Sequence, residues 1–204
     1  MKYIPLFIDF TDRKVLFVGG GKVAERKIAL FDGSKAIITV ISPTITEKIE
    51  ELKQKNRINV LFRKASVKDI NKDYFIVYTA SNDKELNSQI AKQCANSGIL
   101  CNRCDNADES TFINGATVNR GEITVAINSG GVPVISQYIK HKTEETITPE
   151  VVQIAKLAKE LREENKNDTC KIYDLIAKQL NNDSLLRIKN GNINDLKQEI
   201  LECL

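Results

Sequence analysis

The stretch Lys14-Val15-Leu16-Phe17-Val18-Gly19-Gly20-Gly21-Lys22-Val23-Ala24 decides the predicted fold. Its first half is a short apolar run rich in β-branched and aromatic residues, which predicts a buried strand that ends at three glycines. Beyond the glycines, Ala24, Ile28 and Phe31 recur at helical spacing. The stretch therefore predicts a strand, a tight turn and a helix in direct succession.

The glycines match the pattern G-x-G-x-x-A of dinucleotide-binding turns. Gly19 permits the tight turn, Gly21 lets the backbone approach a pyrophosphate, and Ala24 lets the helix pack on the strand. Phosphates would then meet the N–H groups at the helix N-terminus, with Lys22 and Val23 beside them. We predict nucleotide binding here; the alternative is a plain glycine-rich turn in a flavodoxin-like sheet.

Strands and helices alternate over the first ~105 residues. Further strands are expected at 36–41, 60–62, 74–79 and 99–102, and further helices at 45–52 and 83–97. This alternation predicts an α/β fold with a doubly wound parallel sheet. After it, residues 116–127 predict two strands around a turn, residues 133–142 a short helix, and residues 148–204 a small helical domain that packs on something else.

Composition excludes several classes of protein. The chain has 204 residues, 42% hydrophobic and 28% charged, which is typical of globular proteins. Five cysteines, an odd number, do not indicate a secreted disulfide framework. No apolar run is long enough for a membrane span or a signal sequence, so we expect a cytoplasmic protein. A net charge of +3 does not favour nucleic acid as a partner.

The sequence after the second predicted strand leaves the choice between NAD and NADP open. Sites for NAD often carry an acidic residue there, which holds the ribose hydroxyls. This chain has Ser42-Pro43-Thr44, with neither an acid nor an arginine for a 2′-phosphate. The hydroxyls of Ser42 and Thr44 are candidates for contacts to a ribose, although Thr44 is equally suited to capping the next helix.

Asp105 is the candidate catalytic residue. It follows the strand that ends at Asn102, at the sheet edge where ligands bind in open α/β sheets. A carboxylate beside a nicotinamide is a candidate general base, although a turn-forming role is the alternative for an isolated aspartate. We also count Asn102 as a candidate substrate contact. Glycine-rich Ser129-Gly130-Gly131 is either a loop that binds a carboxylate through its N–H groups or a plain turn.

No metal site is predicted. Cys101-x-x-Cys104 has no second pair at zinc-binding spacing, and His141 is the single histidine. Buried or incidental thiols are the interpretation we favour for the two cysteines. His141 lies between two lysines, a pattern that indicates a solvated helix face or a contact to an anionic substrate.

Several segments together resemble the precorrin-2 dehydrogenases, which also form the dehydrogenase–ferrochelatase part of siroheme synthases. The matching segments span about residues 1–145: Pro5–Ile8, Lys14–Lys27, Thr79–Asp83 with Asn87, Cys101–Asp105, Ser110–Phe112 and Ile127–Gly131. They occur in the same order as in the family, and are far more specific than the glycine pattern alone.

The resemblance implies an NAD-binding Rossmann domain over residues 1–113, a dimerisation segment over 114–147 and a helical C-terminal domain over 148–204, assembled as a homodimer. It implies NAD-dependent oxidation of precorrin-2, a tetrapyrrole polycarboxylate, to sirohydrochlorin in siroheme biosynthesis. The family's catalytic aspartate aligns with Asp105, and its nucleotide contacts with residues 21–23 and with Pro43 and Thr44, which favours NAD. On charge alone, Arg103, Arg120 and Lys140 are candidate partners for substrate carboxylates.

Two departures from the family bear on its second activity. The run Gly130-Gly131-Val132-Pro133 lacks the family's usual serine before proline, and the segment after Phe112, Ile113-Asn114-Gly115-Ala116, lacks the proline that is common there. Both departures lie at the expected substrate cleft and leave nucleotide binding intact. The single histidine and the lack of a clear cluster of metal ligands in the sequence lead us to expect a dehydrogenase alone. The alternatives are a bifunctional dehydrogenase–ferrochelatase, an NAD(H)-sensing module without turnover, and a tetrapyrrole carrier.

Overall fold

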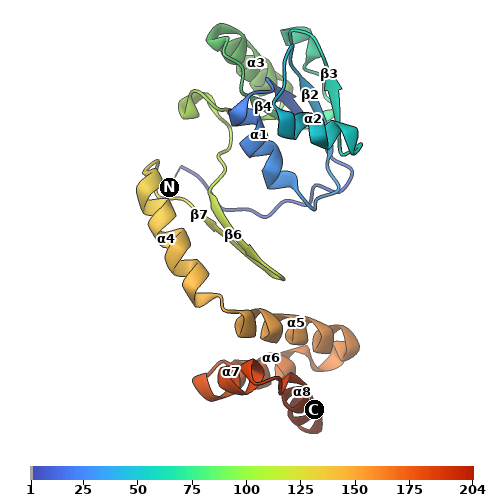
Figure 1. Ribbon diagram of the computed structural model, residues 1–204, viewed down its shortest axis with the longest axis vertical. Coiled ribbons are helices and arrows are strands. Elements are labelled where there is room, and N and C mark those ends of the chain that lie inside the picture. Colours follow the sequence, from blue (N-terminus) through green and yellow to red (C-terminus); the bar gives the residue numbers. More distant parts are fainter. Residues whose placement is uncertain (1) are drawn as a thin grey trace. The chain divides into compact units, whose positions relative to one another are not determined.

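The computed structural model describes residues 2–204 of the chain, which form two compact units (Figure 1). The first unit ends at Asn114, and the second runs from Gly115 to Leu204. No helix among residues 2–204 is both long and apolar enough to cross a membrane.

A five-stranded parallel sheet forms the centre of the first unit, with strand order β3-β2-β1-β4-β5. The strands are β1 (Lys14–Val18), β2 (Ile37–Ile41), β3 (Ile58–Leu61), β4 (Tyr74–Thr79) and β5 (Leu100–Arg103). β1 pairs with β2 on one side and with β4 on the other, so the topological switch point lies at the end of β1. The predicted doubly wound α/β fold is confirmed.

Helices cover both faces of this sheet: α1 (Lys22–Ile28) and α2 (Glu47–Gln54) on one face and α3 (Lys84–Ser97) on the other. On the face of α1, the Phe17 and Tyr78 rings stack with centroids 4.7 Å apart, and Phe31 meets Tyr78 edge-on. On the face of α3, Ile90 and Cys94 pack on alternate residues of the same strands. The alternation of side chains along each strand thus supplies two separate cores.

Helix α2 begins two residues later than the sequence pattern predicts. Thr46 is its N-cap residue, and the backbone there is extended. The N–H of Thr46 donates to the carbonyl of Gly20 at 3.0 Å, which ties the loop after β2 to the glycine turn. Because this bond requires an extended chain, the helix cannot begin at Ile45.

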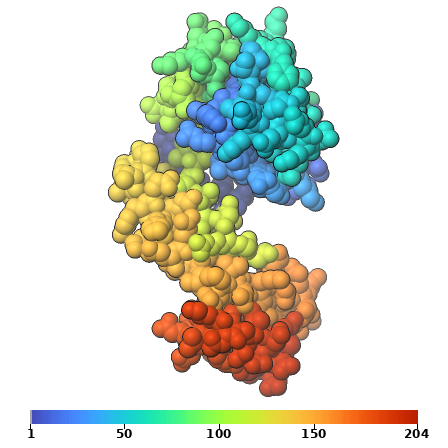
Figure 2. Space-filling view, in the orientation of Figure 1, coloured from blue at the N-terminus to red at the C-terminus, as the bar shows by residue number. Residues whose placement is uncertain are grey.

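The second unit contains a hairpin and five helices. Strands β6 (Ala116–Arg120) and β7 (Ile123–Ile127) are antiparallel, as predicted. The helices are α4 (Pro133–Thr146), α5 (Pro149–Glu164), α6 (Thr169–Gln179), α7 (Asn182–Lys189) and α8 (Ile193–Glu202), so α4 is longer than predicted. Ile154, Leu161 and Ile172 are among the buried residues where α5 to α8 meet. Figure 2 shows α6 to α8, in orange to red, as one contiguous body.

Short 3₁₀ turns complete the chain at Ala29–Phe31, Val67–Asp69, Ala107–Glu109 and Lys166–Asp168.

The glycine turn after β1 is confined on one side and open on the other. Gly19 has a φ of +108°, and a Cβ there would overlap the carbonyl oxygen of Ala80 after β4. A Cβ on Gly20 would lie 2.6 Å from the Ile45 side chain. Gly21 has an ordinary φ of −82°, and no atom lies within 4 Å of a Cβ built on it. The turn therefore requires glycine at 19 for its fold, whereas the space beside Gly21 is empty.

The contrast between Gly19 and Gly21 gives a matched test. We expect Gly19→Ala to lower the free energy of unfolding by about 2 kcal/mol or more, because it combines left-handed strain with a backbone collision. Gly21→Ala should change it by no more than about 0.5 kcal/mol. Urea unfolding of both variants measures the difference. Equal stability of the two variants would contradict this description of the turn.

Candidate functional site

The N-terminus of α1 is open to an anion. Gly21 is its N-cap residue and provides no side-chain cap. The carbonyl of Gly21 accepts the first helical bond from Glu25 at 3.0 Å, and among residues 2–204 no backbone carbonyl accepts the N–H groups of residues 20–24. These unpaired N–H groups, the positive end of the helix dipole and the empty space beside Gly21 fit the pyrophosphate of a dinucleotide. Gly19 lies in the turn before this helix, and Lys22, Val23 and Ala24 are the first three residues of α1.

The loop after β2 lies against this turn and contains the three predicted ribose contacts. Ser42 is buried, and its hydroxyl donates to the carbonyl of Thr44 at 2.6 Å. That bond shapes the loop and leaves the Ser42 oxygen only as an acceptor. Pro43 and Thr44 are exposed, so Thr44 is the residue of the three with a hydroxyl available to solvent or ligand.

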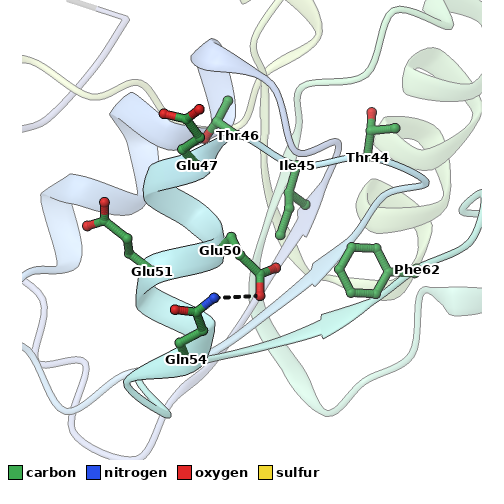
Figure 3. Close-up of a pocket in the computed structure, with 8 residues that line it drawn as sticks. All are labelled: Thr44, Ile45, Thr46, Glu47, Glu50, Glu51, Gln54 and Phe62. Carbon is green, nitrogen blue, oxygen red and sulfur yellow. Dashed lines mark hydrogen bonds between the residues drawn. The ribbon is translucent and has the colours of Figure 1, made fainter.

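A groove of about 610 Å³ begins at Thr44 and runs along α2 (Figure 3). Its lining residues are Thr44, Ile45, Thr46, Glu47, Glu50, Glu51, Gln54 and Phe62. Figure 3 shows Ile45 and Phe62 at its apolar end, while Gln54 donates to Glu50 at 3.3 Å. The groove adjoins the ends of β2 and β3 and is rich in carboxylates. Sequence reasoning missed it, since it is formed by residues from two separate elements.

Asp105 follows β5 and is held by a buried arginine. Arg103 Nε and Nη2 donate to the two oxygens of Asp105, both at 3.1 Å. The Arg103 side chain is 8% exposed and that of Asp105 is 24% exposed. The guanidinium holds the pKa of Asp105 below its ordinary value. Asp105 is therefore ionised at neutral pH, in a fixed orientation at the sheet edge.

Two further groups complete this network. Arg103 Nη1 pairs with Glu109 at 2.6 Å, and Ser88 of α3 donates to Glu109 at 2.9 Å. Asn87 is fully buried, and its Nδ2 donates to Asp105 Oδ1 at 3.3 Å and to the carbonyl of Ser81 at 2.9 Å. Asn87 thus links the loop after β4, which touches Gly19, to the loop that carries Asp105.

The interpretation of Arg103 as a partner for substrate carboxylates is corrected by this geometry. Its donors are occupied by Asp105, Glu109 and the carbonyl of Lys84. Sequence reasoning missed its role because charge alone does not reveal a partner. The signal available was its spacing from Asp105, since residues two apart across a strand end can meet.

The remaining predicted site residues have structural contacts of their own. Asn102 is buried, donates to the carbonyl of Phe112 at 2.9 Å, and lies 3.4 Å from the Cys104 sulfur. Ser129, Gly130 and Gly131 belong to the second unit, between β7 and α4, where Ser129 donates to the carbonyl of Val132. Within residues 2–204, no group of three potential metal ligands lies close enough together to hold an ion.

Comparison with known proteins places this site in context. The chain is 32% identical to a siroheme synthase of Pseudoalteromonas atlantica over 164 residues, and 33% identical to one of Zymomonas mobilis over 175 residues. These alignments cover 80% and 85% of the chain but 35% and 37% of the two relatives. The chain thus spans about a third of the length of the curated relatives it matches.

A solved structure described as "SirC, precorrin-2 dehydrogenase" has the same fold. It superposes with a TM-score of 0.80 at 23% identity, covering 98% of this chain and 100% of that one. A family described as "Putative NAD(P)-binding" matches residues 6–116, which contain the glycine turn, the loop after β2 and Asp105. The match confirms the dinucleotide cofactor expected from the turn. The chain belongs to this NAD(P)-binding family.

Proposed function

We propose that this protein catalyses the NAD-dependent oxidation of precorrin-2 to sirohydrochlorin, a step of siroheme biosynthesis. The observation that carries the proposal is an ionised, oriented Asp105 at the same sheet edge as the open N-terminus of α1. The names of the similar proteins support it, since they include siroheme synthases and a precorrin-2 dehydrogenase.

Each part of the site has a role in this reaction. The oxidation removes a hydride and a proton from the substrate; NAD⁺, when bound, would supply the hydride acceptor. The N–H groups of residues 20–24 hold the pyrophosphate. Asp105 accepts the proton as general base, and Arg103 keeps it in the ionised form that can do so. Asn87 fixes one oxygen of Asp105.

The charges near Thr44 favour NAD over NADP. Glu47, Glu50 and Glu51 line the groove that begins at Thr44, and they would repel a 2′-phosphate. Arg63, the first arginine after β3 in the sequence, donates to both oxygens of Asp69, at 2.9 and 2.5 Å. The loop after β2, residues 42–46, contains no lysine or arginine that could bind a phosphate on the ribose.

The loop of Ser129, Gly130 and Gly131 is our proposed second contact for the substrate. Gly130 and Gly131 have φ values of +65° and +88°, and a Cβ built on either would meet no atom within 4 Å. The N–H of Gly130 donates to Asn128 Oδ1 at 3.1 Å, so the N–H of Gly131 is the group that this loop offers to a carboxylate. We propose that Asn102 acts on the substrate indirectly, because its amide donates a hydrogen bond to the carbonyl of Phe112.

The same chain is proposed to form a homodimer through α4. Val134 is 70% exposed and Tyr138 62% exposed, and Ile135 and Ile139 lie beside them one residue on. These four residues are two i, i+4 pairs and form one apolar stripe on the helix. Large exposed apolar patches mark interaction surfaces, and a second copy of α4 offers a matching one.

The first test is activity. In anaerobic absorbance assays with precorrin-2 and NAD⁺, we expect equal amounts of sirohydrochlorin and NADH. Asp105→Asn should lower kcat by about 10²- to 10⁴-fold, and Asp108→Asn, an exposed neighbour, should leave it unchanged. Adding Fe²⁺ to the product tests the chelatase alternative. NAD⁺ binding without turnover by the folded protein would favour the alternative of an NAD(H)-sensing module. Full activity of the Asp105→Asn variant would exclude Asp105 as the general base.

The second test uses pH. Because Arg103 lowers the pKa of Asp105, we expect Arg103→Met to move the acid limb of kcat/KM to higher pH. It should also lower the free energy of unfolding by about 2 kcal/mol at pH 7. This loss should shrink as the pH falls below about 4, where protonation of Asp105 removes its share of the pairing in the wild type. An unmoved acid limb would show that another group sets it.

The third test is the oligomeric state. Light scattering should give the wild type a mass of twice 22.9 kDa. A double variant, Val134→Lys with Tyr138→Lys, should give the monomer mass, because it places two charges on the apolar stripe. Gln137→Lys, which adds a charge to the same helix outside the stripe, should stay dimeric. A monomeric wild type, or a dimeric double variant, would exclude this interface.

A further inference from the structure

Lys27 of α1 is a half-buried cation. Its ammonium donates to Asn114 Oδ1 at 3.3 Å and forms no ion pair with a carboxylate of residues 2–114. Burial lowers the pKa of this ammonium, the direction expected when a charge loses water without gaining an opposite charge. Buried ammonium groups are normally paired, so a single amide contact leaves this one incompletely stabilised.

The groups around Lys27 do not supply the missing charge. The Cys104 thiol is close enough to influence the pKa of Lys27, but its own pKa is raised, chiefly by burial. The thiol is therefore neutral at pH 7. Arg26, the preceding residue, adds a second positive charge close enough to lower the pKa of Lys27 further. Arg26 and Lys27 thus place two neighbouring positive charges on α1 in the free protein.

The position of Lys27 connects it with the proposed catalytic edge. Ala24 and Ile28 of α1 are buried in the same apolar cluster against which Cys104 and Phe112 pack. Cys104 directly precedes Asp105, and its sulfur contacts Asn102. The Lys27 side chain therefore lies beside the loop after β5, while the pyrophosphate donors of residues 20–24 lie a turn earlier on the same helix.

We propose that Lys27 binds a carboxylate of the substrate. This inference rests on the proposed function, in which the substrate is a tetrapyrrole polycarboxylate. A carboxylate at Lys27 would complete the pairing of its ammonium in a partly dry site, where a charge-assisted hydrogen bond is strong. The ionised Asp105 repels substrate carboxylates, so attraction at Lys27 and repulsion at Asp105 together orient the ring system.

Three variants test this assignment: Lys27→Met, Lys27→Arg and, as a control, Lys72→Met. Lys72 is exposed beside the amino end of β4, so its variant removes the same charge from the opposite edge of the sheet. We expect Lys27→Met to raise the KM for precorrin-2 by about 10- to 100-fold with little change in kcat. The KM for NAD⁺ should stay within about threefold of the wild type, since the cofactor has its own donors. Lys27→Arg should restore most of the affinity.

A melting experiment separates this role from a structural one. Methionine keeps the apolar stem of lysine and removes the unpaired charge. Without substrate or cofactor, the melting temperature of the Lys27→Met variant should therefore exceed that of the wild type by about 2–4 °C. If Lys27 served only to stabilise the fold, the melting temperature of the variant would fall instead. An unchanged KM for precorrin-2, or an equal rise in the KM for NAD⁺, would overturn the assignment.

A second probe keeps the assignment testable if the wild type does not oxidise precorrin-2, the result that would defeat the proposed function itself. Uroporphyrin, an air-stable tetrapyrrole with carboxylate side chains, can then be titrated against each protein by its absorbance. Weaker binding to Lys27→Met than to Lys72→Met would support a carboxylate site at Lys27. Equal binding, or none to any of the proteins, would reject it.

Discussion

The backbone contact between Gly19 and Ala80 is the constraint on which the first unit depends. The carbonyl of Val18 accepts from the N–H of Ala80 at 2.7 Å, and the N–H of Gly19 donates to Ile41 at 3.0 Å. The end of β1 is therefore bonded to both neighbouring strands, with no room for a side chain between it and the loop after β4. Helix α1 begins directly after this turn. Its free N–H groups therefore lie at the sheet edge where β4 and β5 also end.

Charge, rather than apolar packing, fixes the other half of the site. Arg103 is buried between two carboxylates from the loop after β5, and it also donates to a carbonyl at the start of α3. Removing one member would leave a charge with fewer partners in a partly dry place, so the group holds together as a unit. Asn87 extends the unit to the loop after β4. The proposed base is therefore oriented relative to the glycine turn through hydrogen bonds that cross the sheet edge.

Local pattern was sufficient to predict most of the fold. Strand β1, the turn and α1 depend on apolar periodicity and on three glycines, all of which are visible within eleven residues. The start of α2 was not predictable in this way, because a bond from Thr46 to Gly20, 26 positions earlier, decides it. The same limit applies to the site. The sequence singled out Asp105 by its place after a strand, whereas its contacts to Asn87 and the occupied state of Arg103 follow from tertiary packing.

Asp105 and Lys27, which both lie at the loop after β5, differ in how their charges are stabilised. Asp105 accepts from Asn87 and twice from Arg103 before any ligand arrives, so its charge and direction need no reorganisation during a reaction. Lys27 has one amide contact and pays the desolvation cost of its charge in the free protein. An anion that reaches Lys27 relieves that cost, and so gains more affinity there than at a cation already paired. A site for a polycarboxylate substrate gains selectivity from this asymmetry, because a neutral ring of the same shape would leave Lys27 as unpaired as before.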